Sequence, residues 1–110
     1  MTAKEWRIHA DAEDEILRAT SRYDRERAGL GAEFLEAFAA AYAELMRGPV
    51  VGTAQRVGRF TVHRGQLARF PFAIVFAELE EAMLIVAVAH VRRHPTYWRR
   101  RLRKVRAVVR

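Results

Sequence analysis

The apolar and polar positions near the amino terminus predict one short strand followed by an amphipathic helix. Residues 5–9 alternate, with Trp6 and Ile8 on one side, which is typical of a strand. Asp11 is suited to the N-cap of a helix. Beyond it, apolar residues recur at spacings of four, three and four, which line up along one helix face: Ala12, Ile16, Ala19 and Tyr23.

A second amphipathic helix follows the sequence Gly29-Leu30-Gly31, which ends the first one. The same apolar spacing returns until Gly48-Pro49 supplies a stop: Phe34, Phe38, Ala41 and Leu45. We therefore expect the two helices to form an antiparallel hairpin. The acidic run Glu13, Asp14 and Glu15 follows the start of the first helix, where the helix dipole favours negative charge, so we interpret it as helix-start electrostatics rather than as a catalytic or metal cluster.

The period changes to two in the second half of the chain, which predicts three more strands. From Val57 onward, Phe60 and Val62 share one face before a turn near Arg64-Gly65-Gln66. A third strand starts near Phe70 and Pro71, with large side chains on one face and small ones on the other. Residues 82–90 are apolar on both faces, as expected of a central strand.

The chain ends in a segment that predicts a basic amphipathic helix over about residues 95–110. Pro95 is suited to its first turn, and arginines surround an apolar stripe spaced at four, three and four: Trp98, Leu102, Val105 and Val109. This stripe either docks on the chain's own sheet or binds a partner, and the spacing is the same in both cases. We expect a single α+β domain over residues 1–110, with a strand, a helix hairpin, a three-stranded antiparallel meander in the same sheet, and this helix.

Charge adds a second pattern to this picture. The net charge of +7 is uneven: residues 1–50 carry seven Lys/Arg and ten Asp/Glu, whereas residues 51–110 carry thirteen and three. Residues 82–110 contain no acid, so this segment favours a polyanion or an acidic protein segment as a partner over a merely solvated face.

Composition excludes several classes of protein. Cysteine is absent, which rules out a disulfide scaffold and a thiolate metal site. We expect a cytoplasmic protein without a membrane segment, because no apolar run approaches the roughly 20 residues of a membrane helix. We expect no metal or cofactor either. No phosphate-cradling glycine motif occurs, and the step from strand to turn before Pro95 argues against His90 and His94 as a helical metal pair.

Two stretches carry a family resemblance. Residues 69–76, RFPFAIVF, and residues 87–98, AVAHVRRHPTYW, together with the predicted order of elements, resemble the RelE/ParE toxin superfamily. The second stretch is similar to the His-x-Arg-Arg-x-Pro-x-x-Trp ending of ParE-like plasmid-stabilisation proteins, with Trp98 in the final position. The resemblance covers nearly the whole chain and identifies the ParE-like branch.

The resemblance implies the toxin of a type II toxin-antitoxin module, neutralised by a cognate antitoxin. ParE-like members poison DNA gyrase, whereas RelE-like members cut messenger RNA on the ribosome. Ala73 stands where many RNA-cutting members have an arginine, which favours gyrase binding. For such a binding mode the implied partner-binding residues lie in the last third of the chain: Arg92, Arg93, Tyr97, Trp98, Arg99, Leu102 and Val105.

Two alternatives stay open at this point. If the protein is an endoribonuclease, the expected catalytic residues are Arg69, Arg92, Tyr97 and His90, which would hold the scissile phosphate and move protons. If it is a basic binding module without toxicity, its expression would not affect growth.

Overall fold

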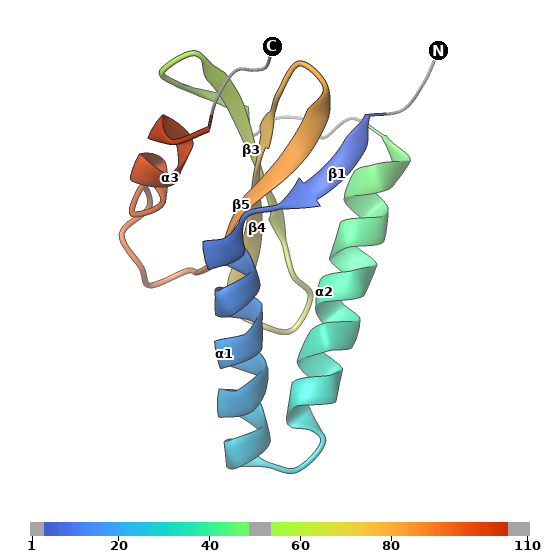
Figure 1. Ribbon diagram of the computed structural model, residues 1–110. Helices are drawn as coiled ribbons and strands as arrows, with labels where there is room; N and C mark the ends of the chain where they lie inside the picture. The colour runs from blue at the N-terminus through green and yellow to red at the C-terminus, as the bar shows by residue number, and fades with distance from the viewer. Residues whose placement is uncertain (1–3, 49–53, 106–110) are drawn as a thin grey trace.

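The computed structural model describes residues 4–48 and 54–105 and has an α+β fold built on one five-stranded sheet (Figure 1). The elements follow in this order: β1 (Glu5–Ile8), α1 (Ala10–Glu26), α2 (Leu30–Arg47), β2 (Gln55–Val57), β3 (Phe60–Gln66), β4 (Phe72–Glu78), β5 (Ala82–His90) and α3 (Arg99–Arg103). The α+β class, the first strand and the antiparallel helix hairpin are confirmed.

The sheet has the strand order β1-β5-β4-β3-β2. Strands β2 to β5 form an antiparallel meander, and β1 adds to it by pairing in parallel with the first half of β5, from Glu5 opposite Ala82 to Ile8 opposite Ile85. A bulge between Val75 and Phe76 shifts the register of β4 against β5. Because β1 is so short, the second half of β5 has no strand beside it on that edge.

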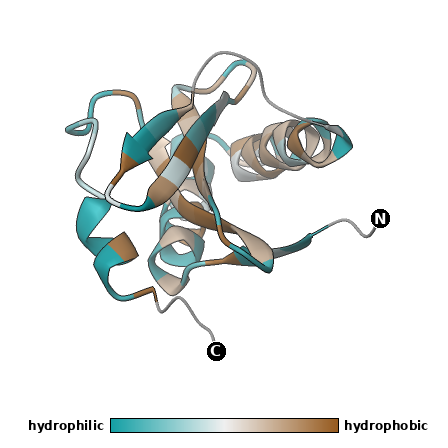
Figure 2. Cartoon of the chain, turned by 90° about the horizontal axis from the view of Figure 1, so that it is seen from above, coloured by the Kyte–Doolittle hydropathy of each residue, from teal (hydrophilic) through white to brown (hydrophobic). Residues whose placement is uncertain are grey.

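Two hydrophobic layers cover the two faces of the sheet. Phe72, Ile74 and Phe76 of β4 pack with α1 and α2, whereas Val75 and Ala77 of the same strand pack on the opposite face, beneath α3. The predicted alternation of β4 is therefore confirmed. In Figure 2 the central strands are largely brown, while α3 is largely teal. The sheet is thus the middle layer of three.

The helix hairpin owes its close approach to glycine. Gly29, just before α2, has φ of 90°, a conformation that glycine adopts without steric cost. A Cβ atom added to Gly31 would lie only 2.6 Å from the carbonyl oxygen of Thr20, so this position needs glycine. The backbone N–H of Gly31 donates a hydrogen bond to Asp24 Oδ1 at 2.8 Å. Aromatic rings fill the space beneath, with Phe34 fully buried against Tyr23 and Phe72.

Several predicted boundaries are wrong. Helix α1 begins at Ala10, and its N-cap is His9, whose Nδ1 accepts from the Asp11 N–H at 3.0 Å, so Asp11 is not the cap. A short extra strand, β2, pairs with β3 and makes the meander four-stranded. The segment Arg64-Gly65-Gln66 belongs to β3, and the turn comes after it.

The carboxyl-terminal helix is also shorter than predicted. Residues 95–98 form turns, and α3 spans only Arg99–Arg103. Pro71 lies in the turn before β4 rather than at the start of the strand. The expected helical position of Val109 lies outside the described residues. No helix in residues 4–48 and 54–105 has the length and apolar character that crossing a membrane requires.

Candidate functional site: a buried carboxylate beside a cationic groove

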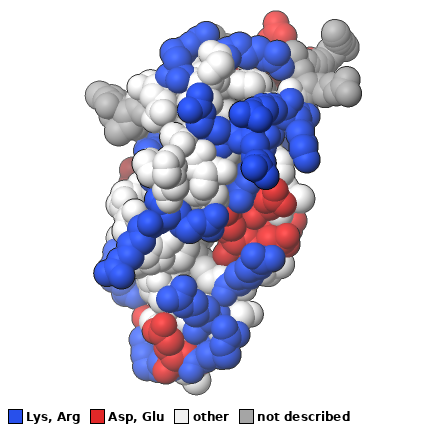
Figure 3. Space-filling model, turned by 90° about the vertical axis from the view of Figure 1, so that its left-hand side faces the viewer, with Lys and Arg blue, Asp and Glu red and all other residues white. Residues whose placement is uncertain are grey.

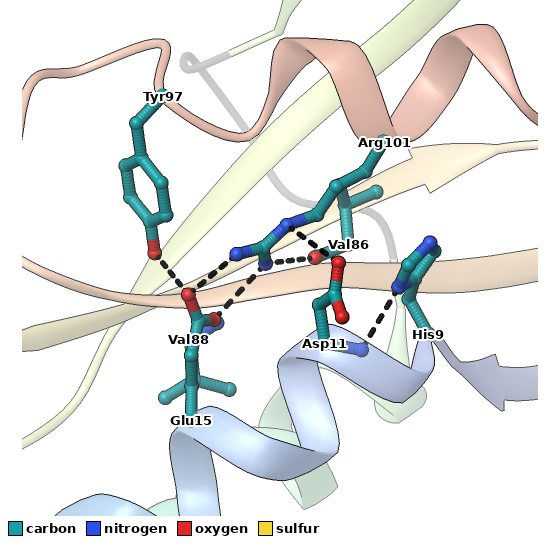
Figure 4. Close-up of polar contacts among 7 residues, drawn as sticks. All are labelled: His9, Asp11, Glu15, Val86, Val88, Tyr97 and Arg101. Atoms are coloured by element: carbon teal, nitrogen blue, oxygen red, sulfur yellow. Dashed lines mark hydrogen bonds and ion pairs between the residues drawn. The ribbon is translucent and has the colours of Figure 1, made fainter.

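The Glu15 carboxylate joins four parts of the fold (Figure 4). It accepts hydrogen bonds from the Tyr97 hydroxyl at 2.7 Å and from the Arg101 guanidinium at 2.8 and 3.2 Å. It also accepts from the Val88 N–H at 2.9 Å. One carboxylate of α1 is therefore bonded to β5, to the segment after it, and to α3.

Glu15 and Arg101 satisfy backbone groups on the edge of β5 that β1 does not reach. The last bond from the β1 side runs from the His9 N–H to the Ile85 carbonyl oxygen at 2.9 Å. Beyond it, Arg101 donates to the Val86 carbonyl oxygen at 2.9 Å, and Glu15 accepts from the Val88 N–H. Unpaired backbone groups are costly when buried, so these two side chains replace the missing strand.

The same contacts set the protonation of the residues around Glu15. Burial lowers the pKa of Arg101, but the hydrogen bond and charge of Glu15 outweigh it, and the pKa of Arg101 is raised overall. Burial and the hydrogen bond to Glu15 raise the pKa of Tyr97 above its ordinary value. Tyr97 thus keeps its proton and is a donor to Glu15, while Arg93 lies over its ring, 3.7 Å from the ring centroid.

A groove opens beside this network, between α1 and the turn after β5. Its volume is about 610 Å³. The lining combines apolar and basic side chains with one acid: Glu15, Arg18, Ala19, Arg22, Pro71, Phe72, Val88, His90, Val91, Arg92 and Arg93. Figure 3, which faces the side of the molecule that carries α3, shows Lys and Arg over much of this side, with acidic patches near its middle and towards its lower end.

The arginines of the groove have no carboxylate partner among the described residues. Within residues 4–48 and 54–105, no hydrogen bond or ion pair is formed by the side chains of Arg18, Arg22 and Arg92. Arg101 by contrast pairs with Glu15 and, at 3.7 Å, with Asp11. The groove therefore carries positive charge that this part of the chain does not neutralise.

His90 lies where β5 ends in the groove. Its Nδ1 accepts from the Arg92 N–H at 3.0 Å, and its ring meets the Phe72 ring edge-on at 5.1 Å. Burial lowers the pKa of His90, and the positive charges of Arg22 and Arg92 lower it further. The neutral imidazole, with Nδ1 as an acceptor, is the form that the folded protein favours.

This lowered pKa of His90 predicts that the folded protein becomes less stable as the pH is lowered. As pH drops below about 6.5, the unfolded chain takes up a proton on His90 before the folded chain does, so the folded state loses stability down to its own lower pKa. Urea unfolding at pH 7.5 and 5.5 should show a smaller loss in the variant His90→Asn, whose side-chain oxygen replaces Nδ1 as an acceptor. An equal pH dependence in both proteins would contradict this assignment.

The structure brings only some of the predicted site residues together. His90, Arg92 and Arg93 line the groove, whereas Trp98 and Leu102 are 1% and 3% exposed beneath α3, with Val105 packed beside them. The described part of the apolar stripe, Trp98, Leu102 and Val105, thus docks on the chain's own sheet.

Arg99 and Arg69 lie elsewhere. Arg99 is exposed and lines a separate hollow of about 150 Å³ with Phe60. Arg69 has φ of 71° in the turn before β4 and pairs with Glu33 of α2 at 3.0 Å. Arg69 and Tyr97 are not part of the groove lining. The four residues expected of an endoribonuclease therefore do not all line this groove.

Sequence reasoning missed Arg18, Arg22, Glu15 and Arg101. Arg18 and Arg22 are one helical turn apart on either side of buried Ala19, a spacing that places them on one face and was visible in the sequence. Within the described residues, no group of three or more His, Cys, Asp or Glu side chains is placed to hold a metal ion.

No model of a known protein family matches this chain, and no curated protein matches it at a significant level.

Proposed function

We propose that this chain is a ParE-like toxin of the RelE/ParE superfamily that inhibits growth by binding and poisoning DNA gyrase, and that a cognate antitoxin neutralises it. The arrangement of side chains in the segment after β5 supports action by binding a partner rather than by catalysis. Arg92 and Arg93 are exposed at the edge of an open groove, and Tyr97 is held by Glu15. Such a toxin would act in the cytoplasm.

The endoribonuclease alternative, which would act on messenger RNA at the ribosome, is less well supported. Tyr97 is committed as a donor to Glu15, and its raised pKa makes it a poor base near neutral pH. Arg69 is paired with Glu33. Only His90 and Arg92 of the four candidate catalytic residues line the groove, and a general acid-base pair needs partners within hydrogen-bond reach of the same substrate.

The proposal predicts that the double variant Arg92→Ala/Arg93→Ala loses growth inhibition while remaining folded. Both side chains are exposed, so their removal should change stability little, whereas a partner that contacts them would lose two charged contacts. Induced cultures, with and without the neighbouring antitoxin gene, should be followed for growth, DNA-damage response and new RNA ends.

The matched control is Arg7→Ala/Arg47→Ala, which removes two exposed arginines that are not part of the groove lining. It should leave growth inhibition intact. Arrest with DNA damage and intact messages supports gyrase poisoning, and arrest with cuts at ribosomal positions supports the endoribonuclease. Unchanged arrest by the folded Arg92→Ala/Arg93→Ala variant would refute the assignment of this surface, and no arrest at all would indicate a non-toxic binding module.

A further inference from the structure

We propose that the groove between α1 and the turn after β5 binds a protein segment carrying both acidic and apolar side chains, and that Arg18 and Arg22 of α1 recognise its carboxylates together with Arg92. This inference rests on the proposed function for the existence of a protein partner. It moves the expected partner surface away from the stripe beneath α3, because Trp98 and Leu102 are already buried there.

The charge of the groove calls for an anionic ligand. Four arginines and one acid line it, and that acid, Glu15, is already bonded to Arg101 and Tyr97. Arg22 and Arg92 both line the groove, and the positive charge of each lowers the pKa of His90 in the same lining. Like charges gathered without a counter-charge repel one another, and an incoming carboxylate would relieve this repulsion.

The apolar part of the lining specifies more than charge. Pro71 and Val91 are exposed apolar residues of the lining, Val91 at 52%, whereas Ala19, Phe72 and Val88 of the lining are already buried. A ligand with charge alone would leave this apolar surface in contact with water. A segment that alternates acidic and apolar residues can bury one set of side chains and pair the other with the arginines.

These contacts favour a protein segment over single-stranded RNA. Proteins that bind unpaired nucleotides stack the bases on exposed aromatic faces. Among the residues that line the groove, the Phe, Tyr and Trp types are represented by Phe72. Its side chain is 7% exposed and packed against His90. The ring of Tyr97 is covered by Arg93. Apart from the half-buried His90 ring, the groove therefore offers little aromatic surface on which a base could stack.

A binding assay with defined probes tests this inference. The probe is a fluorescein-labelled peptide of twelve residues that alternates Glu and Leu, titrated with the full chain and followed by fluorescence anisotropy. Controls are a Glu/Ser peptide of the same charge, a Lys/Leu peptide and a twelve-nucleotide oligouridine. We expect the Glu/Leu peptide to bind most tightly, and Arg18→Gln/Arg22→Gln to weaken its binding by about tenfold or more, which corresponds to about 1.4 kcal/mol. The control Arg7→Gln/Arg47→Gln should change it by less than about twofold.

A second readout locates the bound peptide and does not depend on the α1 variant being folded. Carboxylates placed beside His90 should raise its pKa, so an NMR titration of wild-type protein should show an upward shift with the Glu/Leu peptide and none with the Lys/Leu peptide. The inference is overturned if the peptide does not bind, if Arg18→Gln/Arg22→Gln binds it normally, or if oligouridine binds more tightly through the same arginines.

The two proposals fail separately. Peptide binding that depends on Arg18 and Arg22, together with no growth arrest on induction, would reject the toxin and keep the groove. Growth arrest with DNA damage but no peptide binding would keep the toxin and reject this site.

Discussion

Replacing Glu15 with alanine should lower the free energy of unfolding by about 3–5 kcal/mol, because it leaves the Arg101 guanidinium buried without its main counter-charge. The side chains of Glu15 and Arg101 are 14% and 13% exposed, and the Tyr97 hydroxyl and the Val88 N–H would lose their acceptor as well. Asp11, 3.7 Å from Arg101, retains part of the compensation. Urea unfolding followed by far-ultraviolet circular dichroism measures the loss.

The matched control is Glu13→Ala, which removes an exposed acid from the first turn of the same helix. It should cost no more than about 1 kcal/mol, the size of a helix-dipole effect. Because Glu15 and Arg101 share one network, adding Arg101→Met to Glu15→Ala should cost less than Arg101→Met does alone. Additive losses would show that the pair is not coupled.

Replacing Trp98 with alanine should destabilise the protein by about 3–5 kcal/mol, the usual cost of truncating a large aromatic residue in a core. Trp98 is 1% exposed and packs with Leu102 against Val75 and the other residues of that face of the sheet. The same unfolding measurement applies. If Trp98 served only to contact a partner, Trp98→Ala would instead reduce binding and leave the free energy of unfolding unchanged.

Trp98→Phe is the discriminating control. The Trp98 Nε1 atom is buried and has no hydrogen-bond partner among the described residues. Phenylalanine therefore removes a buried, unsatisfied N–H while keeping most of the ring, and an unsatisfied donor is costly. We expect Trp98→Phe to lose much less stability than Trp98→Ala. Equal losses would mean that the indole makes a specific contact that phenylalanine cannot replace.

Periodicity predicted the parts of the fold that one local segment decides. The alternation in residues 72–77 reports which face of β4 meets the helices, and the spacing from Phe34 to Leu45 reports the buried face of α2. The ends of helices and strands were less predictable. Both Asp11 and His9 suit the start of a helix, and His9 is the N-cap in the folded chain. The strand β2 has three residues, too few for a period to emerge.

The candidate site was predictable only in part, because its main contacts join distant positions. Glu15 was interpreted as helix-start electrostatics, and no local pattern indicates that it bonds to Tyr97, 82 residues away, or to Arg101, 86 residues away. The basic motif after β5 did single out Arg92 and Arg93, and both line the groove. Their neighbours on α1 became evident only once the sheet had placed α1 beside β5.

The parallel pairing of β1 with β5 has a consequence for folding. Glu5 lies opposite Ala82, so closing this edge of the sheet joins two segments that are far apart in the sequence, and Arg101 adds to the closure through Glu15. Contacts this distant in sequence form slowly, whereas a helix hairpin such as α1 and α2 is local. Because synthesis proceeds from the amino terminus, the helix hairpin emerges before β4 and β5, and its apolar face stays exposed until those strands are made. The groove takes shape only when the last third of the chain has left the ribosome.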